Sequence, residues 1–97
     1  MDQQLDDENI IFIGSKPPMN YIIAVLTEFK KNNEVIIKAR GRSISKAVET
    51  AEVVRHKFLQ HVNIVDIKLG LENIIDDKTS KPMDIPSIEI YLEAPSS

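Results

Sequence analysis

Residues 34–48 read EVIIKARGRSISKAV, and this stretch decides the fold because its hydrophobic period changes partway along. Val35, Ile37 and Ala39 alternate along one face, which is the period of a β-strand. After Gly41, which permits a tight turn, apolar residues recur every three or four positions, which is the period of an α-helix. The stretch therefore predicts a strand, a turn and a helix.

The predicted helix carries one apolar stripe and extends to about Leu59. Ser43 is its expected N-cap, because a hydroxyl at that position can accept a free N–H of the first helical turn. The residues of the stripe are Ile44, Ala47, Val48, Ala51, Val54 and Phe58.

Toward the N-terminus, a strand and another helix are expected before this stretch. The run Ile10-Ile11-Phe12-Ile13, within residues 9–14, is apolar on both faces and predicts a strand in the interior of a sheet. Pro17 and Pro18 end that strand, and a proline suits the first turn of a helix. The apolar residues of that helix are Met19, Ile22, Ile23, Leu26 and Phe29.

Toward the C-terminus, two strands are expected, joined by a polar hairpin tip at residues 76–82. Residues 62–72 alternate apolar with polar side chains, the pattern of a half-buried strand, and Ile88, Ile90 and Leu92 repeat it. The order β-α-β-α-β-β predicts an α+β two-layer sandwich with both helices on one face of the sheet.

Length and composition indicate one small intracellular domain. We expect an acidic disordered tail at residues 1–8, a single domain at 9–94 and a flexible C-terminus at 95–97. The chain has no cysteine, which excludes disulfides and thiolate metal sites. No apolar run approaches the roughly 20 residues that span a bilayer, so we expect a soluble cytoplasmic protein without a membrane partner.

The formal net charge of −3 argues at first against a nucleic-acid-binding protein, but the charges are unevenly distributed. Residues 1–13 hold four acids and no base, and residues 47–97 hold nine acids and five bases. Residues 14–46 hold seven bases and two acids. The positive charge is therefore concentrated in one block of the sequence.

Enzymatic and metal-binding chemistry have little support in the sequence. No nucleophile lies beside a base, and no pair of carboxylates suggests acid–base catalysis. His56 and His61 lack a third ligand and an acidic neighbour at i+3 or i+4, and Asp76-Asp77 lacks the spacing of a calcium loop. The run at 14–18 lacks the spacing of a P-loop. We therefore expect no catalytic residue, no metal and no cofactor.

The segment from Lys38 to Lys46 instead suits phosphate. It holds four cations, a glycine, two hydroxyls and the expected helix start within nine residues. Arginine offers a planar fork to phosphate oxygens, and the free N–H groups of a helix start add partial positive charge. The alternative is a solvated strand end, and Lys16 in its proline-stiffened loop favours the phosphate site only slightly.

Two stretches resemble the signature sequences of the archaeal Alba family, namely residues 13–21 (IGSKPPMNY) and residues 36–48 (IIKARGRSISKAV). The resemblance covers roughly residues 9 to 93. It implies the same β-α-β-α-β-β fold, which is similar to the C-terminal domain of a bacterial translation initiation factor. It also implies a dimer that coats or bridges double-stranded DNA with little sequence preference and often binds RNA, without catalysing a reaction.

The resemblance also implies roles for individual residues. Lys16 matches a loop lysine that lies over the nucleic acid at the dimer centre, and it is the candidate for acetylation, with a deacetylase as partner. Phe58 matches an aromatic residue that packs one dimer against the next, although it could be ordinary core. The expected nucleic-acid-binding residues are Lys16, Asn20, Tyr21, Lys38, Arg40, Arg42, Ser43, Lys46, Lys78 and Lys81.

Several features depart from the family pattern and leave alternatives open. Ser15 stands where many members have a second lysine, and the hairpin tip has two aspartates and no arginine, so we expect weaker binding. The alternatives are an RNA-binding subunit of a ribonuclease P-like or translation-related particle, and a weak binder that acts through heterodimers with a paralogue. The main hypothesis, a protein of the nucleoid, requires that Lys16, Arg40 and Arg42 share one surface without acids among them.

Overall fold

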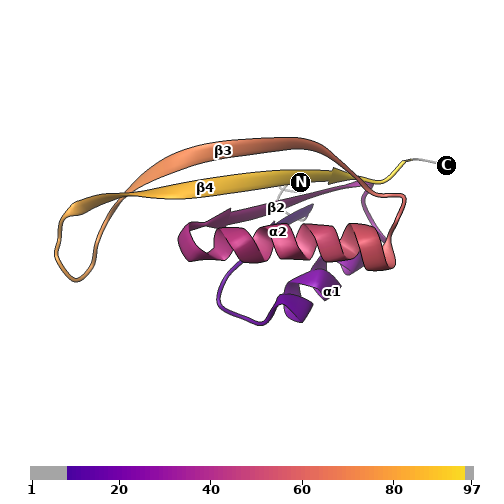
Figure 1. The fold of residues 1–97 in the computed structure, drawn as a ribbon, viewed down its shortest axis with the longest axis horizontal. Helices are drawn as coiled ribbons and strands as arrows, with labels where there is room; N and C mark the ends of the chain where they lie inside the picture. The colour runs from indigo at the N-terminus through magenta and orange to yellow at the C-terminus, as the bar shows by residue number, and fades with distance from the viewer. Residues whose placement is uncertain (1–8, 96–97) are drawn as a thin grey trace, which may run out of the picture.

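The computed structural model describes residues 9–95, and its elements follow the predicted order (Figure 1). The elements are β1 (Ile10–Phe12), α1 (Pro18–Glu28), β2 (Glu34–Arg40), a 3-10 turn (Gly41–Ser43), α2 (Ile44–Val53), a π-helical turn (Val54–Phe58), β3 (Asn63–Ile75) and β4 (Pro82–Glu93). The β-α-β-α-β-β prediction is confirmed. The expected tail at 1–8 and residues 96–97 lie outside the described residues.

One four-stranded mixed sheet forms one layer, in the order β1-β2-β4-β3, and both helices cover the same face of it (Figure 1). β1 pairs parallel with β2, whereas β4 pairs antiparallel with both β2 and β3. The core lies between the helices and the central strands. Its most enclosed members include Val25, Val35, Ile37, Ala47, Val54 and Leu92.

β1 differs from the prediction of an interior strand. It is an edge strand of three residues that pairs only with β2. Ile11 packs against the core, but the side chain of Phe12 points to the opposite face and is 68% exposed. An apolar run on both faces therefore does not indicate burial here, because no layer covers the second face.

The two helices also differ from the sequence expectation in detail. In α1 the buried residues are Ile22 and Val25, whereas Met19 and Ile23 of the expected stripe are exposed. Ser43 has helical backbone angles and makes no side-chain capping bond. The 3-10 turn before α2 takes the place of such a cap, since the Ile44 N–H bonds to the Gly41 carbonyl.

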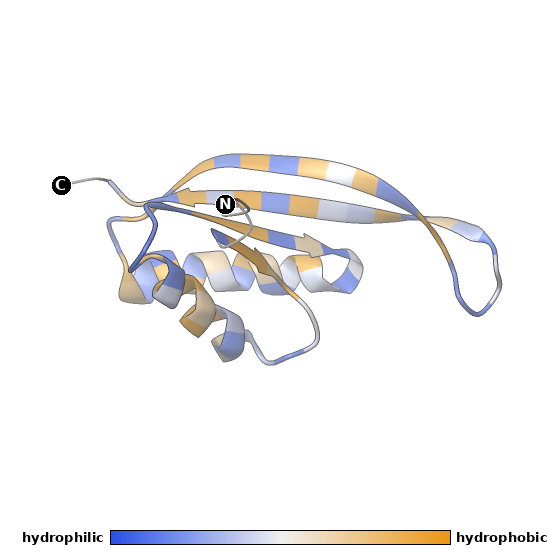
Figure 2. Cartoon of the chain, turned by 180° about the vertical axis from the view of Figure 1, so that it is seen from behind, coloured by the Kyte–Doolittle hydropathy of each residue, from blue (hydrophilic) through white to orange (hydrophobic). Residues whose placement is uncertain are grey.

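β3 and β4 are longer than expected and extend beyond the body as a two-stranded arm (Figure 1). Hydrophobic and hydrophilic residues alternate along both strands (Figure 2). A register shift between Ile64 and Asp66 marks a bulge, after which Ile67 and Leu69 pair with core residues of β4. β3 is nonetheless uncovered, because the helices lie under the central strands. Leu69 is 80% exposed, so the half-buried prediction for this strand is wrong for the single chain.

Candidate nucleic-acid interface

Three chain segments come together at one end of the sheet. Because β1 and β2 run parallel, the loop 13–17 and the 3-10 turn leave the sheet at the same end, and the Ile13 N–H donates to the Lys38 carbonyl at 2.9 Å. Arg40 pairs with Ser87, and the part of β4 before Ser87 extends past this end as the arm. The topology thus gathers the predicted cations of separate segments at one end of the molecule.

The loop that carries Lys16 is held by the side chains of two predicted binding residues, Tyr21 and Lys46. The Tyr21 hydroxyl accepts the backbone N–H groups of Gly14 and Lys16, each at 3.0 Å. The Lys46 Nζ donates to the carbonyls of Gly14 at 2.9 Å and Lys16 at 2.7 Å. That ammonium group also lies 5.7 Å from the centre of the Tyr21 ring. Tyr21 and Lys46 therefore fix the loop backbone that presents Lys16.

The two strand-end cations are in ion pairs. The Lys38 Nζ lies 3.6 Å from Glu89 Oε2, and the Arg40 Nη1 lies 2.9 Å from Glu72 Oε1. The expectation that no acid lies among Lys16, Arg40 and Arg42 is therefore wrong for Arg40, because β3 brings Glu72 beside it, and a nucleic-acid interface must depend mainly on the other cations. All four side chains are partly exposed, and such pairs contribute only about 0–1 kcal/mol, so phosphate can compete for these cations.

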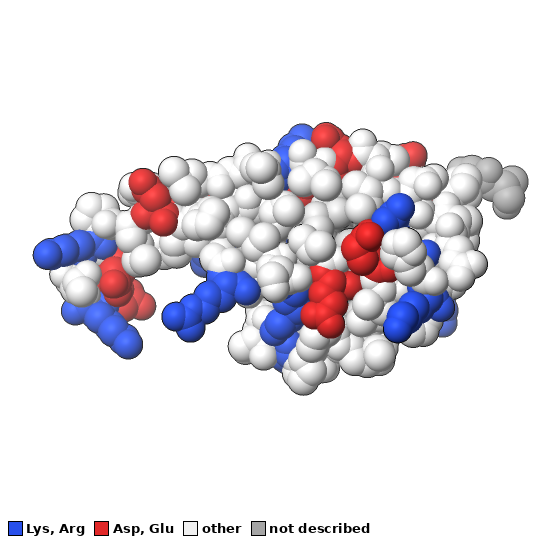
Figure 3. Space-filling model, viewed as in Figure 1, with Lys and Arg blue, Asp and Glu red and all other residues white. Residues whose placement is uncertain are grey.

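Four other predicted cations are exposed, namely Lys16, Arg42, Lys78 and Lys81. Within residues 9–95, none of these four side chains has an acid or a hydrogen-bond acceptor as partner. Figure 3 shows Lys and Arg atoms at the arm tip and on the neighbouring end of the body, with some Asp and Glu atoms between them. These four cations are the ones most available to a polyanion.

The remaining residues predicted at this end have weaker positions. Asn20 is exposed in the first turn of α1, and Ser43 is half-buried in the 3-10 turn. At the arm tip, the Asp76 carboxylate accepts the Lys78 N–H at 2.9 Å, and the Asp76 carbonyl accepts the Ser80 N–H at 2.8 Å. Asp76 is therefore a turn residue, as expected, and its charge stays beside Lys78.

One of the two histidines, His56, has a partner that the sequence reasoning overlooked. His56 Nε2 lies 3.3 Å from Oε1 of Glu52, which stands at i−4 rather than at i+3 or i+4. Glu52 also pairs with Arg55, and this hydrogen bond is the main reason that the pKa of the Glu52 carboxyl is lowered. Among the described residues, no group of three potential ligands could hold a metal ion.

The outer face of the sheet, which the helices leave open, carries residues that the sequence reasoning missed. The register aligns Phe12, Lys38, Glu89 and Lys68 in one row across the four strands. The Tyr91 hydroxyl donates to Glu89 Oε1 at 2.6 Å, which lowers the pKa of Glu89 and raises that of Tyr91. Only the sheet register reveals this row, because its members come from four separate segments.

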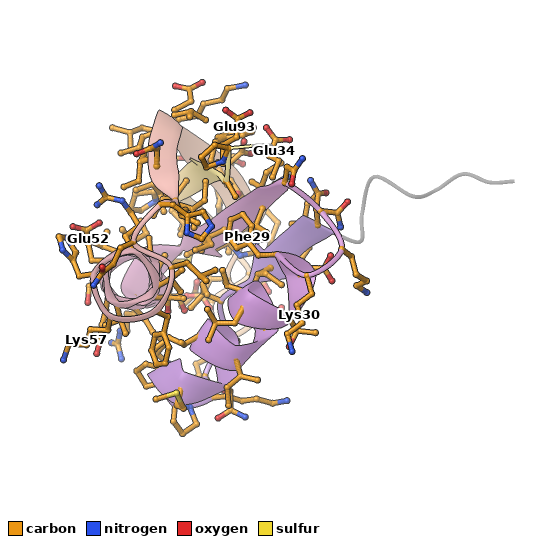
Figure 4. The ribbon with its side chains drawn as sticks, turned by 90° about the vertical axis from the view of Figure 1, so that its right-hand side faces the viewer. Phe29, Lys30, Glu34, Glu52, Lys57 and Glu93 are labelled. Atoms are coloured by element: carbon orange, nitrogen blue, oxygen red, sulfur yellow. The ribbon has the colours of Figure 1, made fainter. Side chains whose placement is uncertain are left out.

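Phe58 lies at the other end of α2 and is 48% exposed, so it is not an ordinary core residue. It borders a hollow that Leu26 and Phe29 also line. Figure 4 looks onto this end of the molecule, where Phe29 lies between the helices and the sheet. The position leaves Phe58 accessible for the contact between dimers that the resemblance implies.

A small α+β protein with exposed cations at one end of its sheet is typical of nucleic-acid-binding domains. The Alba family model matches residues 9–70, and the chain belongs to that family. This membership agrees with the expectation that the chain is not an enzyme. Among the described residues, no helix is long and apolar enough to cross a membrane.

Relatives of known name support the assignment over most of the chain. The chain is 49% identical over 92 residues to the DNA/RNA-binding protein Alba of Methanocella arvoryzae, covering 94% of this chain and 95% of the relative. It is 51% identical over 87 residues to the DNA/RNA-binding protein Alba of Thermoplasma acidophilum, covering 89% and 96%. The structure of Alba from Thermoplasma volcanium superimposes with a TM-score of 0.82 at 46% identity, covering 88% of this chain and 99% of that one.

A more distant structure, ALBA1 from Trypanosoma brucei, has a TM-score of 0.72 at 20% identity, covering 92% of this chain and 71% of that one. At this identity the likeness concerns the fold alone. The fold predicted from the sequence is thus confirmed by a close relative and found again in a remote one.

Proposed function

We propose that this chain binds double-stranded DNA without sequence preference, as a dimer that coats or bridges the duplex, and that it also binds RNA. The observation that carries the proposal is a group of exposed cations that have no acidic partner within residues 9–95, namely Lys16 and Arg42 at one end of the sheet and Lys78 and Lys81 on the arm that projects from that end. The relatives named DNA/RNA-binding protein Alba support both ligands. Such a protein would associate with the chromosome in the cytoplasm, as a nucleoid component.

The proposed contacts divide into three kinds. The four unpaired cations contact phosphates directly. Lys38 and Arg40 contribute by exchanging Glu89 and Glu72 for phosphate oxygens. Tyr21 and Lys46 act through the loop they hold, and Asn20 and Ser43 border the contact surface.

An uncovered apolar stripe on β3 supports the dimer. Ile67, Leu69 and Leu71 lie on the helix side of the sheet but have no helix over them, and Val48 of α2 is exposed as well. Exposed apolar side chains that form a continuous stripe favour a protein partner. A second copy would bury this stripe against its own and double the number of available cations.

Salt dependence tests the backbone contacts. Each phosphate contact contributes about −0.9 to the slope of log affinity against log salt on duplex DNA. Arg42→Ala should flatten the slope by about one unit, equally on unrelated duplex sequences. Lys57→Ala is the matched control, because Lys57 is an exposed lysine of the π-helical turn that follows α2, and it should leave the slope unchanged. An unaltered slope for Arg42→Ala would contradict the assignment.

Two alternatives remain, a heterodimer and an RNA-binding subunit. The net charge of −3 and the arginine-free arm suit a chain that binds through a heterodimer with a more basic paralogue, and native mass spectrometry of material from cells would detect such pairs. Backbone contacts of this kind also suit an RNA-binding subunit of a ribonucleoprotein, such as a ribonuclease P-like or translation-related particle. Competition between matched RNA and DNA duplexes distinguishes that function from DNA coating.

Lys16 is also the proposed site of regulation. Its side chain is exposed at the tip of the loop, so an acetyltransferase and a deacetylase could reach it. Acetylation would remove one of the four unpaired charges. Because residue 15 is a serine, this lysine would be the single target in the loop.

A further inference from the structure

The outer face of the sheet contains an open hollow of about 390 Å³ to which all four strands contribute. This volume is within the range of about 300–1,000 Å³ of pockets that hold small ligands. Both helices lie on the opposite face, so the hollow opens away from the body (Figure 1). The lining residues that matter are Phe12, Lys38, Arg40, Glu72, Ser87 and Glu89.

One wall of the hollow is the ring of Phe12. This side chain is 68% exposed and is not part of the hydrophobic core. The Lys38 ammonium group lies 5.9 Å from the ring centre, at one edge of the hollow. An exposed aromatic ring on the open face of a four-stranded sheet offers a flat surface on which a nucleobase can stack.

Small residues leave the centre of the outer face of the sheet without large side chains. Gly70 pairs with Ser87, which in turn pairs with Arg40. A Cβ atom added at Gly70 would lie only 2.7 Å from the Ser87 Oγ, so any larger residue at position 70 would have to displace Ser87. The space between the Phe12 ring and the carboxylates of Glu72 and Glu89 therefore stays open.

The polar groups around the hollow have complementary chemistry. Glu89 and Glu72 present carboxylate oxygens, which when ionised only accept hydrogen bonds. The amino groups of cytosine, adenine and guanine donate such bonds, whereas uracil has no amino group. Lys38 and Arg40 stand beside these carboxylates, where they can reach the phosphates on either side of a base.

We propose that this face binds an unpaired nucleotide of a single strand, with its base stacked on Phe12, its amino group bonded to Glu89 or Glu72, and its flanking phosphates on Lys38 and Arg40. The inference rests on the proposed function for the class of ligand. It shares the strand cations Lys38 and Arg40 with the duplex contacts, but it adds Phe12, Glu72 and Glu89 of the outer face. A base inside a duplex is stacked and paired, so it cannot enter. The hollow thus adds recognition of single-stranded RNA or DNA to duplex binding.

A tryptophan reporter tests the stacking directly. The chain contains no tryptophan, so Phe12→Trp places the only indole at the proposed wall. Titration with single strands of about 10 nucleotides should quench its emission, more with oligocytidine than with oligouridine. The matched control is Ile23→Trp, at an exposed residue of α1 in the helix layer on the opposite face of the sheet, whose emission should stay unchanged. Parallel titrations with RNA and DNA strands show which sugar is preferred.

Affinity provides the second readout. Phe12→Ala should weaken single-strand binding by about 5- to 150-fold and leave duplex affinity and its salt slope unchanged. Because Phe12 lies outside the core, this variant should keep its circular dichroism spectrum.

The inference is overturned if Phe12→Trp emission stays constant at strand concentrations that saturate binding by anisotropy. It is also overturned if Phe12→Ala binds single strands as tightly as the parent chain, or if the parent binds duplex but no single strand. Failure to bind any nucleic acid would refute the proposed function together with it.

Discussion

Lys46 distinguishes a residue that touches phosphate from one that positions the residue that does. Its ammonium group donates two short hydrogen bonds, to the carbonyls of Gly14 and Lys16, and lies against the Tyr21 ring. Lys46→Met removes the charge and both bonds while it keeps the length of the side chain. We expect the loop to loosen and Lys16 to lose its fixed position.

The size of the effect follows from the contacts. A hydrogen bond from a charged group contributes about 1.5–3 kcal/mol, but water can reach both carbonyls once the ammonium group is gone. After this compensation by water each of the two bonds contributes about 1 kcal/mol, so the loss of unfolding free energy should be about 2 kcal/mol. For a domain of this size that lowers the melting temperature by about 8–16 °C. The amides of Gly14 and Lys16, bonded to the Tyr21 hydroxyl, should exchange hydrogen faster.

Thermal unfolding, amide exchange and the salt slope of duplex binding are measured together on Lys46→Met. Lys57→Met is the control, because Lys57 is an exposed lysine of the following π-helical turn, and its melting should change by less than about 0.5 kcal/mol. If Lys46→Met melts and exchanges like the parent but flattens the salt slope by about 0.9, Lys46 contacts phosphate itself. That result would refute the positioning role.

Two further predictions concern the surface of β3 and the acid–base behaviour of the outer face. Leu69→Lys should convert a dimer into single copies in light scattering without unfolding them, since Leu69 is largely exposed in the chain, whereas Met19→Lys on α1 should leave the assembly intact; equal masses for both variants would exclude the β3 stripe as the interface. The folded pKa of Glu89 is lowered from its ordinary 4.5, chiefly by the Tyr91 hydroxyl, so its contribution to stability is present above pH 4.5 and is lost as the pH falls through the folded pKa. Glu89→Gln should therefore reduce the acid-induced loss of unfolding free energy below about pH 4.5, and an unchanged pH profile would show that the Tyr91–Glu89 bond does not stabilise the fold.

The element order could be predicted because each element shows its own period in the sequence. Val35, Ile37 and Ala39 alternate and are buried, and the shift to helical spacing after Gly41 places α2 correctly. Whether the second face of each element is buried or exposed could not be predicted in the same way. Phe12 and Leu69 have the apolar character of core residues, yet both are exposed. Phe12 points to the outer face, which no layer covers, and Leu69 lies on β3, beyond the helix layer that covers the central strands.

The candidate site was predictable only in part, for a similar reason. Cations that lie together in the sequence suggested a phosphate site, and the parallel pairing of β1 and β2 does bring Lys16 to the same end as the 3-10 turn. Their partners come from far along the chain. Glu72 reaches Arg40 across 32 residues, and Lys46 reaches the Lys16 carbonyl across 30, so neither contact has a local signal.

The arrangement of ion pairs explains how a chain with an excess of acids can present a positive surface. At the end seen in Figure 4, two cations have acids within one helical turn, in the pairs Glu28–Lys31 and Glu52–Arg55, so part of the positive charge is neutralised there. At the end of the sheet that carries the loop 13–17, Glu72 and Glu89 form ion pairs with the strand cations Arg40 and Lys38. Within residues 9–95, Lys16 and Arg42 have no acidic partner, and a polyanion would be steered to this end despite the net charge of −3. The same pairs that weaken the strand cations for duplex binding place carboxylates beside them on the outer face of the sheet, so this face offers hydrogen-bond acceptors to a base next to cations for its phosphates.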